Sequence, residues 1–134
     1  MPRVSAAFFA VAAVCLLLGM AWGMQMGGSE DFTMMPAHAH LNLLGWVTLA
    51  LYGTFYALTA NTMSPRLAWI NFALSTIGTA LMIAFLALFL PARDASYIPG
   101  MVAGEVASVL GLLVFGVAVA KELLRPRLRA TGAG

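Results

Sequence analysis

The sequence predicts an all-α membrane protein, built as an up-down-up-down bundle of four transmembrane helices. Two observations support this fold class. Of the 134 residues, 62% are hydrophobic and 9% are charged, whereas roughly 25% of all residues are charged in a soluble domain. The apolar residues also fall into four runs, each long enough to cross a hydrocarbon layer of roughly 30 Å. Short connections between four such runs place neighbouring helices antiparallel.

The four runs cover about residues 5–27, 37–60, 67–90 and 99–121, and we expect them to form one transmembrane domain over residues 1–134. Glycine and acidic residues follow the first run. Pro36 begins the second, because proline is tolerated in a first helical turn. The third run ends at Pro91, and Pro99 opens the fourth. The residues after Arg129 are expected to fray.

The first run also resembles a signal peptide, since Arg3 precedes it. It has no clear small-x-small cleavage site, no convincing lipobox around Cys15, and an apolar core longer than a usual h-region. We therefore expect an uncleaved first helix. Cys15 is the only cysteine, which excludes a disulfide within the chain.

The cations are unevenly distributed between the two sides of the predicted spans. Only Arg93 falls on the same side as Glu30, Asp31 and Asp94. The other cations fall on the opposite side: Arg3, Arg66, Lys121, Arg125, Arg127 and Arg129. The positive-inside rule predicts an inner-membrane protein with both termini in the cytoplasm. Cations at helix ends do not favour nucleic-acid binding, so membrane lipid is the expected surrounding partner.

The two histidines, His38 and His40, lie at the outer mouth of the second predicted helix. Ionisable side chains in a membrane span are costly and usually functional. At about 100° per residue, the two rings point to faces about 200° apart, so one helix does not aim both at one metal ion. A helix N-terminus and burial both favour neutral imidazole, which is the form that binds metals. The alternative is that both residues only cap the helix at the interface.

The two histidine faces differ in composition. The His38 face continues through Asn42 and Gly45, a small and polar stripe typical of helix packing in membranes. The His40 face continues through Leu44 and Val47 and is smooth and apolar, which suits lipid, a subunit partner or a flat hydrophobic cofactor.

The stretch HAHLNLLGWVTLALYGTFY, residues 38–56, resembles the second transmembrane helix of subunit I in the haem-copper oxidase superfamily. Within that superfamily it is most similar to nitric oxide reductases and NnrS-type proteins. In those reductases a His-x-Asn-Leu-Leu run supplies an axial ligand of the low-spin haem b. The resemblance therefore implies that His40 binds haem b, and we expect His38, Asn42, Leu44 and Val47 close to the cofactor.

The chain departs from this family in two respects. The family subunit has around a dozen helices and takes its second haem ligand from a later histidine, whereas no histidine follows His40 here. The copper-site histidines are also absent, so gas reduction at a binuclear centre is not implied. The second axial ligand stays open between His40 of a second copy in a homodimer, no ligand at all with the iron open to a gas, and a methionine. The methionine candidates are Met20, Met24, Met26, Met34, Met35 and Met101.

Two charged residues on the outer side fit a haem site. Arg93 has a planar guanidinium suited to a haem propionate, although it also fits an ordinary interfacial role. Glu105 lies about one and a half turns into the fourth helix, where a carboxylate is not expected to face lipid. It is a candidate to orient His38, to relay a proton, or to bind metal together with His40, His38 and Met101. The alternative is a protonated side chain bonded to a backbone carbonyl.

Copper is the main competing cofactor. The segments MAWGMQMGG and TMMPAHAH place methionines around the same outer loop as the histidines, and thioether with imidazole suits Cu(I). Methionine is also common filler in apolar helices. No catalytic constellation for hydrolysis is present. The sequence thus predicts a haem b protein for electron transfer or for gas or redox sensing, as a homodimer with a redox partner, with a Cu(I)-binding accessory protein as the alternative.

Overall fold

The computed structural model describes residues 1–125. Arg127, Arg129 and the predicted frayed tail lie outside the described residues. Over residues 1–125 every regular element is helical, and four helical spans are long and apolar enough to cross a membrane. The predicted fold class is therefore confirmed, and each span begins and ends within about one turn of its predicted boundary.

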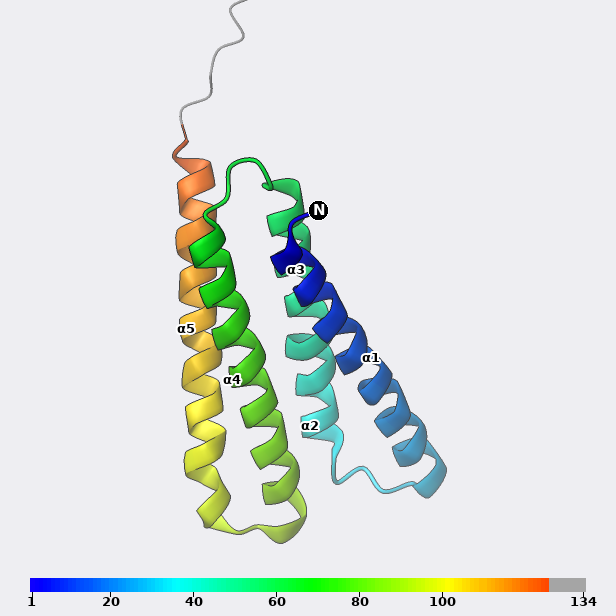
Figure 1. Cartoon of the computed structure of the whole chain (residues 1–134). Helices are drawn as coiled ribbons and strands as arrows, with labels where there is room; N and C mark the ends of the chain where they lie inside the picture. Colours follow the sequence, from blue (N-terminus) through cyan, green and yellow to red (C-terminus); the bar gives the residue numbers. More distant parts are fainter. Residues whose placement is uncertain (126–134) are drawn as a thin grey trace, which may run out of the picture.

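The four spans are connected by short loops and run alternately up and down (Figure 1). The second span has three parts, α2, η1 and α3, and a short 3-10 turn, η2, precedes the fourth. In chain order the elements are α1 (Arg3–Ser29), α2 (Met35–His40), η1 (Leu41–Thr48), α3 (Leu49–Leu58), α4 (Pro65–Ala92), η2 (Ala95–Tyr97) and α5 (Ile98–Leu123).

Local signals fix the helix ends. The spans after the first each have a proline in their first turn, where its missing N–H costs nothing; these are Pro36, Pro65 and Pro99. α1 and α4 end at residues in the left-handed conformation, Glu30 at φ 55° and Arg93 at φ 53°. These two residues occupy the place that glycine most often takes at a helix C-terminus.

Helices α4 and α5 run side by side along their lengths (Figure 1), and glycines allow the close approach. A Cβ at Gly104 would lie 2.7 Å from the Cα of Met82, and one at Gly78 would lie 2.7 Å from the Ser108 hydroxyl. Small residues at interfaces are the usual means of packing helices in membranes. α5 is the least buried of the four spans, because it packs mainly on α4.

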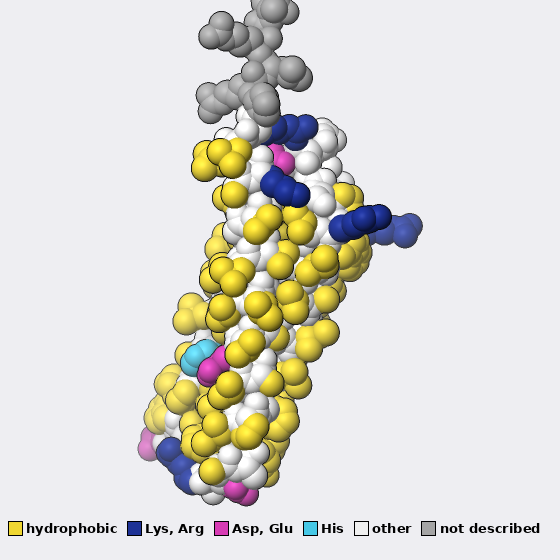
Figure 2. Space-filling model, turned by 90° about the vertical axis from the view of Figure 1, so that its left-hand side faces the viewer, with side chains coloured by type: hydrophobic (Ala, Val, Ile, Leu, Met, Phe, Trp, Pro, Cys, Tyr) yellow, Lys and Arg dark blue, Asp and Glu magenta, His cyan; other side chains and the backbone are white. Residues whose placement is uncertain are grey.

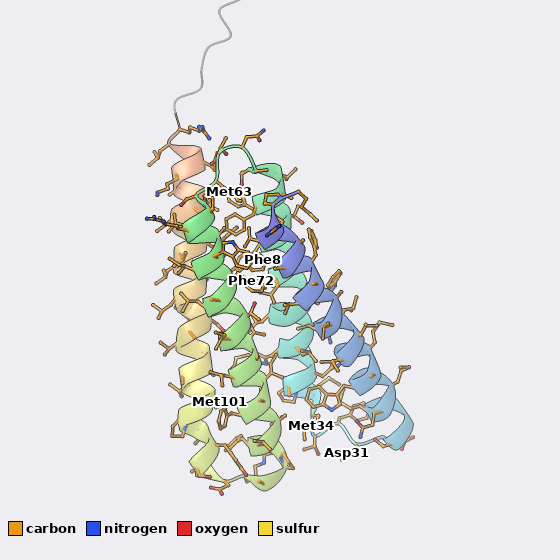
Figure 3. All side chains as sticks on the ribbon, viewed as in Figure 1. Phe8, Asp31, Met34, Met63, Phe72 and Met101 are labelled. Carbon is orange, nitrogen blue, oxygen red and sulfur yellow. The ribbon has the colours of Figure 1, made fainter. Side chains whose placement is uncertain are left out.

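The larger core lies toward the end that carries the N-terminus. Phe8 of α1 stacks on Tyr56 and meets Phe72 of α4 edge to face, with centroids 5.8 and 5.1 Å apart, and Figure 3 shows Phe8 and Phe72 close together between these helices. Phe115 of α5 closes the same layer against Tyr52, at 4.3 Å. The second span and α5 are therefore held together at this end by aromatic packing.

The middle of the second span is a π-helix, which the sequence analysis did not predict. Over Leu41–Thr48 the backbone is wider than an α-helix, and the Thr48 hydroxyl donates to the Leu43 carbonyl at 2.8 Å, five residues back. A π-turn takes more than the 3.6 residues of an α-turn. Leu41, Gly45 and Leu49, which are four residues apart and all buried, form the packing face of this part of the second span.

Candidate functional site

A cavity of about 500 Å³ lies between the second span, α4 and α5, and it is partly open to the outside of the bundle. It is on the side of the aromatic layer away from the N-terminus. Most of its wall is apolar, including Leu44, Leu49, Met82, Val109 and Leu112. Its size falls in the range of roughly 300–1,000 Å³ that cofactor and small-molecule sites occupy.

His40 is the histidine that lines this cavity. Its Nδ1 lies 2.7 Å from the carbonyl oxygen of Pro36, one turn earlier. Because a carbonyl can only accept, Nδ1 must carry the proton and donate. In the neutral ring Nε2 then carries no proton, and its lone pair can bind a metal ion. A backbone hydrogen bond on the other ring nitrogen is the usual way that proteins orient a metal-binding histidine.

Glu105 of α5 lines the same cavity as His40. Figure 2 shows a histidine and an acidic side chain next to each other among hydrophobic side chains, between the charged residues of the two ends and nearer the lower end in this view. α5 has 26 residues, so it is about 39 Å long at 1.5 Å per residue, longer than a hydrocarbon layer of roughly 30 Å. Glu105 lies about 10 Å along this helix. Its Cα therefore falls within the length of helix that an apolar layer would cover, where a carboxyl group is expensive unless it serves a site; the side chain is exposed on the surface of the bundle.

Hydroxyl groups form part of the cavity wall. Thr48, Ser75, Thr79 and Ser108 each contribute a side chain. The Ser108 hydroxyl is buried and has no hydrogen-bond partner within the described residues, and such groups are costly to leave unsatisfied. The cavity thus offers hydrogen-bonding capacity to an occupant.

A buried polar chain connects the cavity with the core. Ser75 donates to the Asn71 side-chain carbonyl at 2.8 Å, and the Asn71 amide donates to the Tyr56 hydroxyl at 3.1 Å. Asn71 and Tyr56 are fully buried. Each bond satisfies polar groups that would otherwise be costly in the apolar interior, and the bond from Asn71 to Tyr56 links α4 to α3.

His38 has a different environment from His40. It is half-buried against α1, where a Cβ on Gly23 would lie 3.2 Å from its Cε1 atom. The Asn42 amide lies within 3.4 Å of both His38 ring nitrogens and donates to the His38 carbonyl at 3.0 Å. The prediction that the two rings point to different faces is confirmed. His38 and Asn42 belong to the contact between α1 and the second span, which Gly19 permits because a Cβ there would overlap the Asn42 amide.

The four predicted metal ligands do not form one site. Within residues 1–125 no group of three or more His, Cys, Asp or Glu side chains could hold a metal ion. Glu105 lines the same cavity as His40, and His38 does not line it; of the three candidate roles of Glu105, the orientation of His38 stays a prediction. Met101 packs against the buried cluster of Leu41, Met82 and Ile83 and is not part of the cavity wall.

The remaining predicted cofactor residues divide between the cavity and the surface. Leu44 lines the cavity, whereas Val47 is 41% exposed and does not line it. Arg93 is exposed at the end of α4, and its role toward a propionate stays a prediction.

The carboxylates in the loops at this end accept hydrogen bonds. The Thr33 hydroxyl and amide lower the pKa of Asp31 below its usual value, and the Ser96 amide does the same for Asp94.

The methionines proposed for copper point in different directions. Met20, Met24 and Met35 are exposed, whereas Met26 of α1 is buried. Met34 lies in the loop before α2 (Figure 3). A Cu(I) site needs thioethers that converge, and this arrangement does not favour one.

Sequence reasoning missed several residues of the cavity wall, above all Ser75, Thr79, Met82 and Ser108. A signal for them was available. Small and hydroxylated residues recur at helical spacing in both later spans, as in Ser75 and Thr79, and this pattern predicts a helix contact in membranes. Met82 gives no such signal, because a single methionine in an apolar run resembles ordinary core filler.

No protein-family model matches the chain, and no solved structure matches it. One curated protein is similar: the heme-copper oxidase subunit I+III of Aeropyrum pernix is 34% identical over 130 aligned residues. The match covers 87% of this chain and 16% of that protein, so the chain spans a small part of the length of the curated relative. This similarity supports the expected relation to the haem-copper oxidase superfamily and a multi-pass membrane protein. The narrower likeness to nitric oxide reductases and NnrS-type proteins stays a prediction.

Proposed function

We propose that this chain is a membrane redox protein that binds haem b in the cavity between the second span and α5, with His40 as an axial ligand. The observation that supports this best is the hydrogen bond from His40 Nδ1 to the Pro36 carbonyl. It selects the tautomer whose Nε2 can bind iron, at the wall of an apolar cavity. The similarity to a heme-copper oxidase subunit supports redox work in a membrane.

The residues present fit a haem. The apolar wall of the cavity suits a flat macrocycle, and its volume of about 500 Å³ suits an occupant of cofactor size. Ser108 and Thr79 offer hydroxyl groups to polar atoms of the occupant. Arg93, in the outer loop, is our candidate partner for a propionate. Haem iron would supply reversible one-electron transfer.

The chain's own residues would then perform three tasks. His40 binds the iron and is held in position by Pro36. The aliphatic wall, including Leu44 and Leu112, excludes water from the macrocycle. The aromatic layer around Phe115 separates the cavity from the end that carries the N-terminus.

The test is the absorption spectrum and haem content of the full-length protein, purified in detergent, with His40→Ala and His38→Ala as a matched pair. We expect the wild type to show a Soret band that changes on reduction. His40→Ala should lose the haem or its low-spin spectrum, because burial does not replace an iron–nitrogen bond. His38→Ala should retain low-spin haem, since its ring packs on α1. Helix content by circular dichroism reports folding of both variants.

Two results would reject the proposal. One is a wild-type protein that carries copper and no Soret band. The other is loss of haem in His38→Ala while His40→Ala keeps it.

A further inference from the structure

Met82 is the methionine that lines the cavity with His40 within residues 1–125. It comes from α4, whereas His40 comes from α2, so two different walls of the cavity carry the two side chains. The neighbour of His40 in the chain, Leu41, packs in one buried cluster with Met82. This contact places Met82 at the level of His40 along the bundle.

The α4 backbone is held firmly at Met82. A Cβ on Gly104 would lie 2.7 Å from the Met82 Cα and 2.8 Å from the Gly78 carbonyl oxygen, so α5 presses directly on this turn. The Met82 side chain is 3% exposed. Its three rotatable bonds still allow the sulfur atom to adapt to an occupant of the cavity. The Met82 backbone is therefore held in place, whereas the position of its sulfur atom is adjustable.

Methionine also serves as filler in apolar cores, and Met101 provides a comparison. Both methionines pack in the cluster of Leu41 and Ile83. Met82 also forms part of the cavity wall, whereas Met101 does not. A thioether needs no hydrogen-bond partner when the cavity is empty. Burying it as a second metal ligand in an apolar layer therefore costs little free energy.

We propose that Met82 is the second axial ligand of the haem, opposite His40, an assignment that rests on the proposed function. The iron would then be six-coordinate with one imidazole and one thioether, all from a single chain. This ligand pair raises the reduction potential relative to two histidines. It also leaves no open position for a gas, which favours electron transfer over gas sensing.

The test compares Met82→Leu, Met82→His and the control Met101→Leu in the full-length protein purified in detergent. The readouts are haem content, spin state by electron paramagnetic resonance, carbon monoxide binding to the reduced protein, and midpoint potential. We expect low-spin haem with one haem per chain and no carbon monoxide binding in the wild type and in Met101→Leu. Met82→Leu should lose the low-spin signal and bind carbon monoxide. Met82→His should regain low-spin haem at a lower potential.

The outcomes separate this inference from the proposed function. A wild type without haem overturns both. Wild-type haem that is five-coordinate, or that stays low-spin in Met82→Leu, overturns the Met82 assignment alone. One haem shared by two chains, with His40 as both ligands, also overturns it. If Met82→Leu loses all haem, Met82→His decides: low-spin haem at a lower potential supports the ligand role, and loss of haem there as well overturns it.

Discussion

His40 and Glu105 are both costly side chains in a membrane span, and both line the same cavity. The His40 ring satisfies one nitrogen with its own backbone through Pro36. Glu105 lines the same cavity as Ser108. Lipid would leave both without a polar partner.

Replacing Glu105 tests its contribution directly. If Glu105 braces the occupant of the cavity or the His40 ring, Glu105→Gln should keep the fold and weaken haem retention by roughly 10–100-fold, as loss of outer-shell partners does at metal sites. Haem loss to an acceptor such as apomyoglobin measures this retention.

Glu122→Gln is the matched control, because Glu122 lies at the other end of α5, near Arg125. Equal retention in wild type and Glu105→Gln, with an unchanged midpoint potential, would return Glu105 to a purely structural role.

At the scale of the element, the π-helix in the second span connects packing to the site. His40 directly precedes it, and Leu44 and Thr48 within it line the same cavity as His40. π-Helical turns are uncommon and often mark functional sites. The hydrogen bond from the Thr48 hydroxyl to the Leu43 carbonyl stabilises this segment.

Removing that hydroxyl should weaken the segment. Thr48→Val keeps the shape of the side chain and loses the donor, so we expect a loss of about 0.5–1.5 kcal/mol in the free energy of unfolding. Thr48→Ser keeps the donor and should be close to wild type. Thermal unfolding in detergent, followed by circular dichroism, measures both. A Thr48→Val protein as stable as wild type would show that the π-helix does not depend on this bond.

The contact between α4 and α5 allows a second test of an element. In Gly104→Ala the new Cβ meets the backbone of Met82, which no rotamer change can relieve. We expect a loss of about 1–3 kcal/mol, typical of overpacking.

Gly116→Ala is the control, since a Cβ there meets nothing within 4 Å. It should stabilise α5 by up to about 1 kcal/mol through helix propensity. A Gly104→Ala protein that unfolds at the temperature of wild type would contradict the close approach of the two helices.

The sequence predicted the helices well and the site only in part, for physical reasons. Helix ends follow from local features, such as Pro36 and Pro65, and from the lengths of apolar runs. The different directions of His38 and His40 follow from helical geometry. The partner of His40 does not, because it depends on which helix packs where: Glu105 belongs to a helix that meets the second span through Phe115 and is positioned by α4.

For the whole molecule, charge separates the two ends of the bundle. Arg3, Arg66 and Lys121 lie at the end where α1 and α4 begin and α5 ends, whereas Arg93 lies with acidic loop residues at the other end. Figure 2 shows this separation, with a long hydrophobic band between the charged ends. The site is nearer the acidic end, since His40 follows the first loop closely.

This asymmetry predicts the orientation in the membrane. Loops rich in lysine and arginine stay in the cytoplasm, so we expect both termini inside and the loop over residues 28–33 outside. Reporter fusions measure it: alkaline phosphatase, active only outside, should work in that loop and fail after Gly134, and green fluorescent protein should do the reverse. Moving three arginines into the outer loop provides the control and should reduce the export of that loop. An exported C-terminus in the unaltered protein would invert the bundle, and the cavity with His40 would then open near the cytoplasmic surface and meet a different set of electron donors.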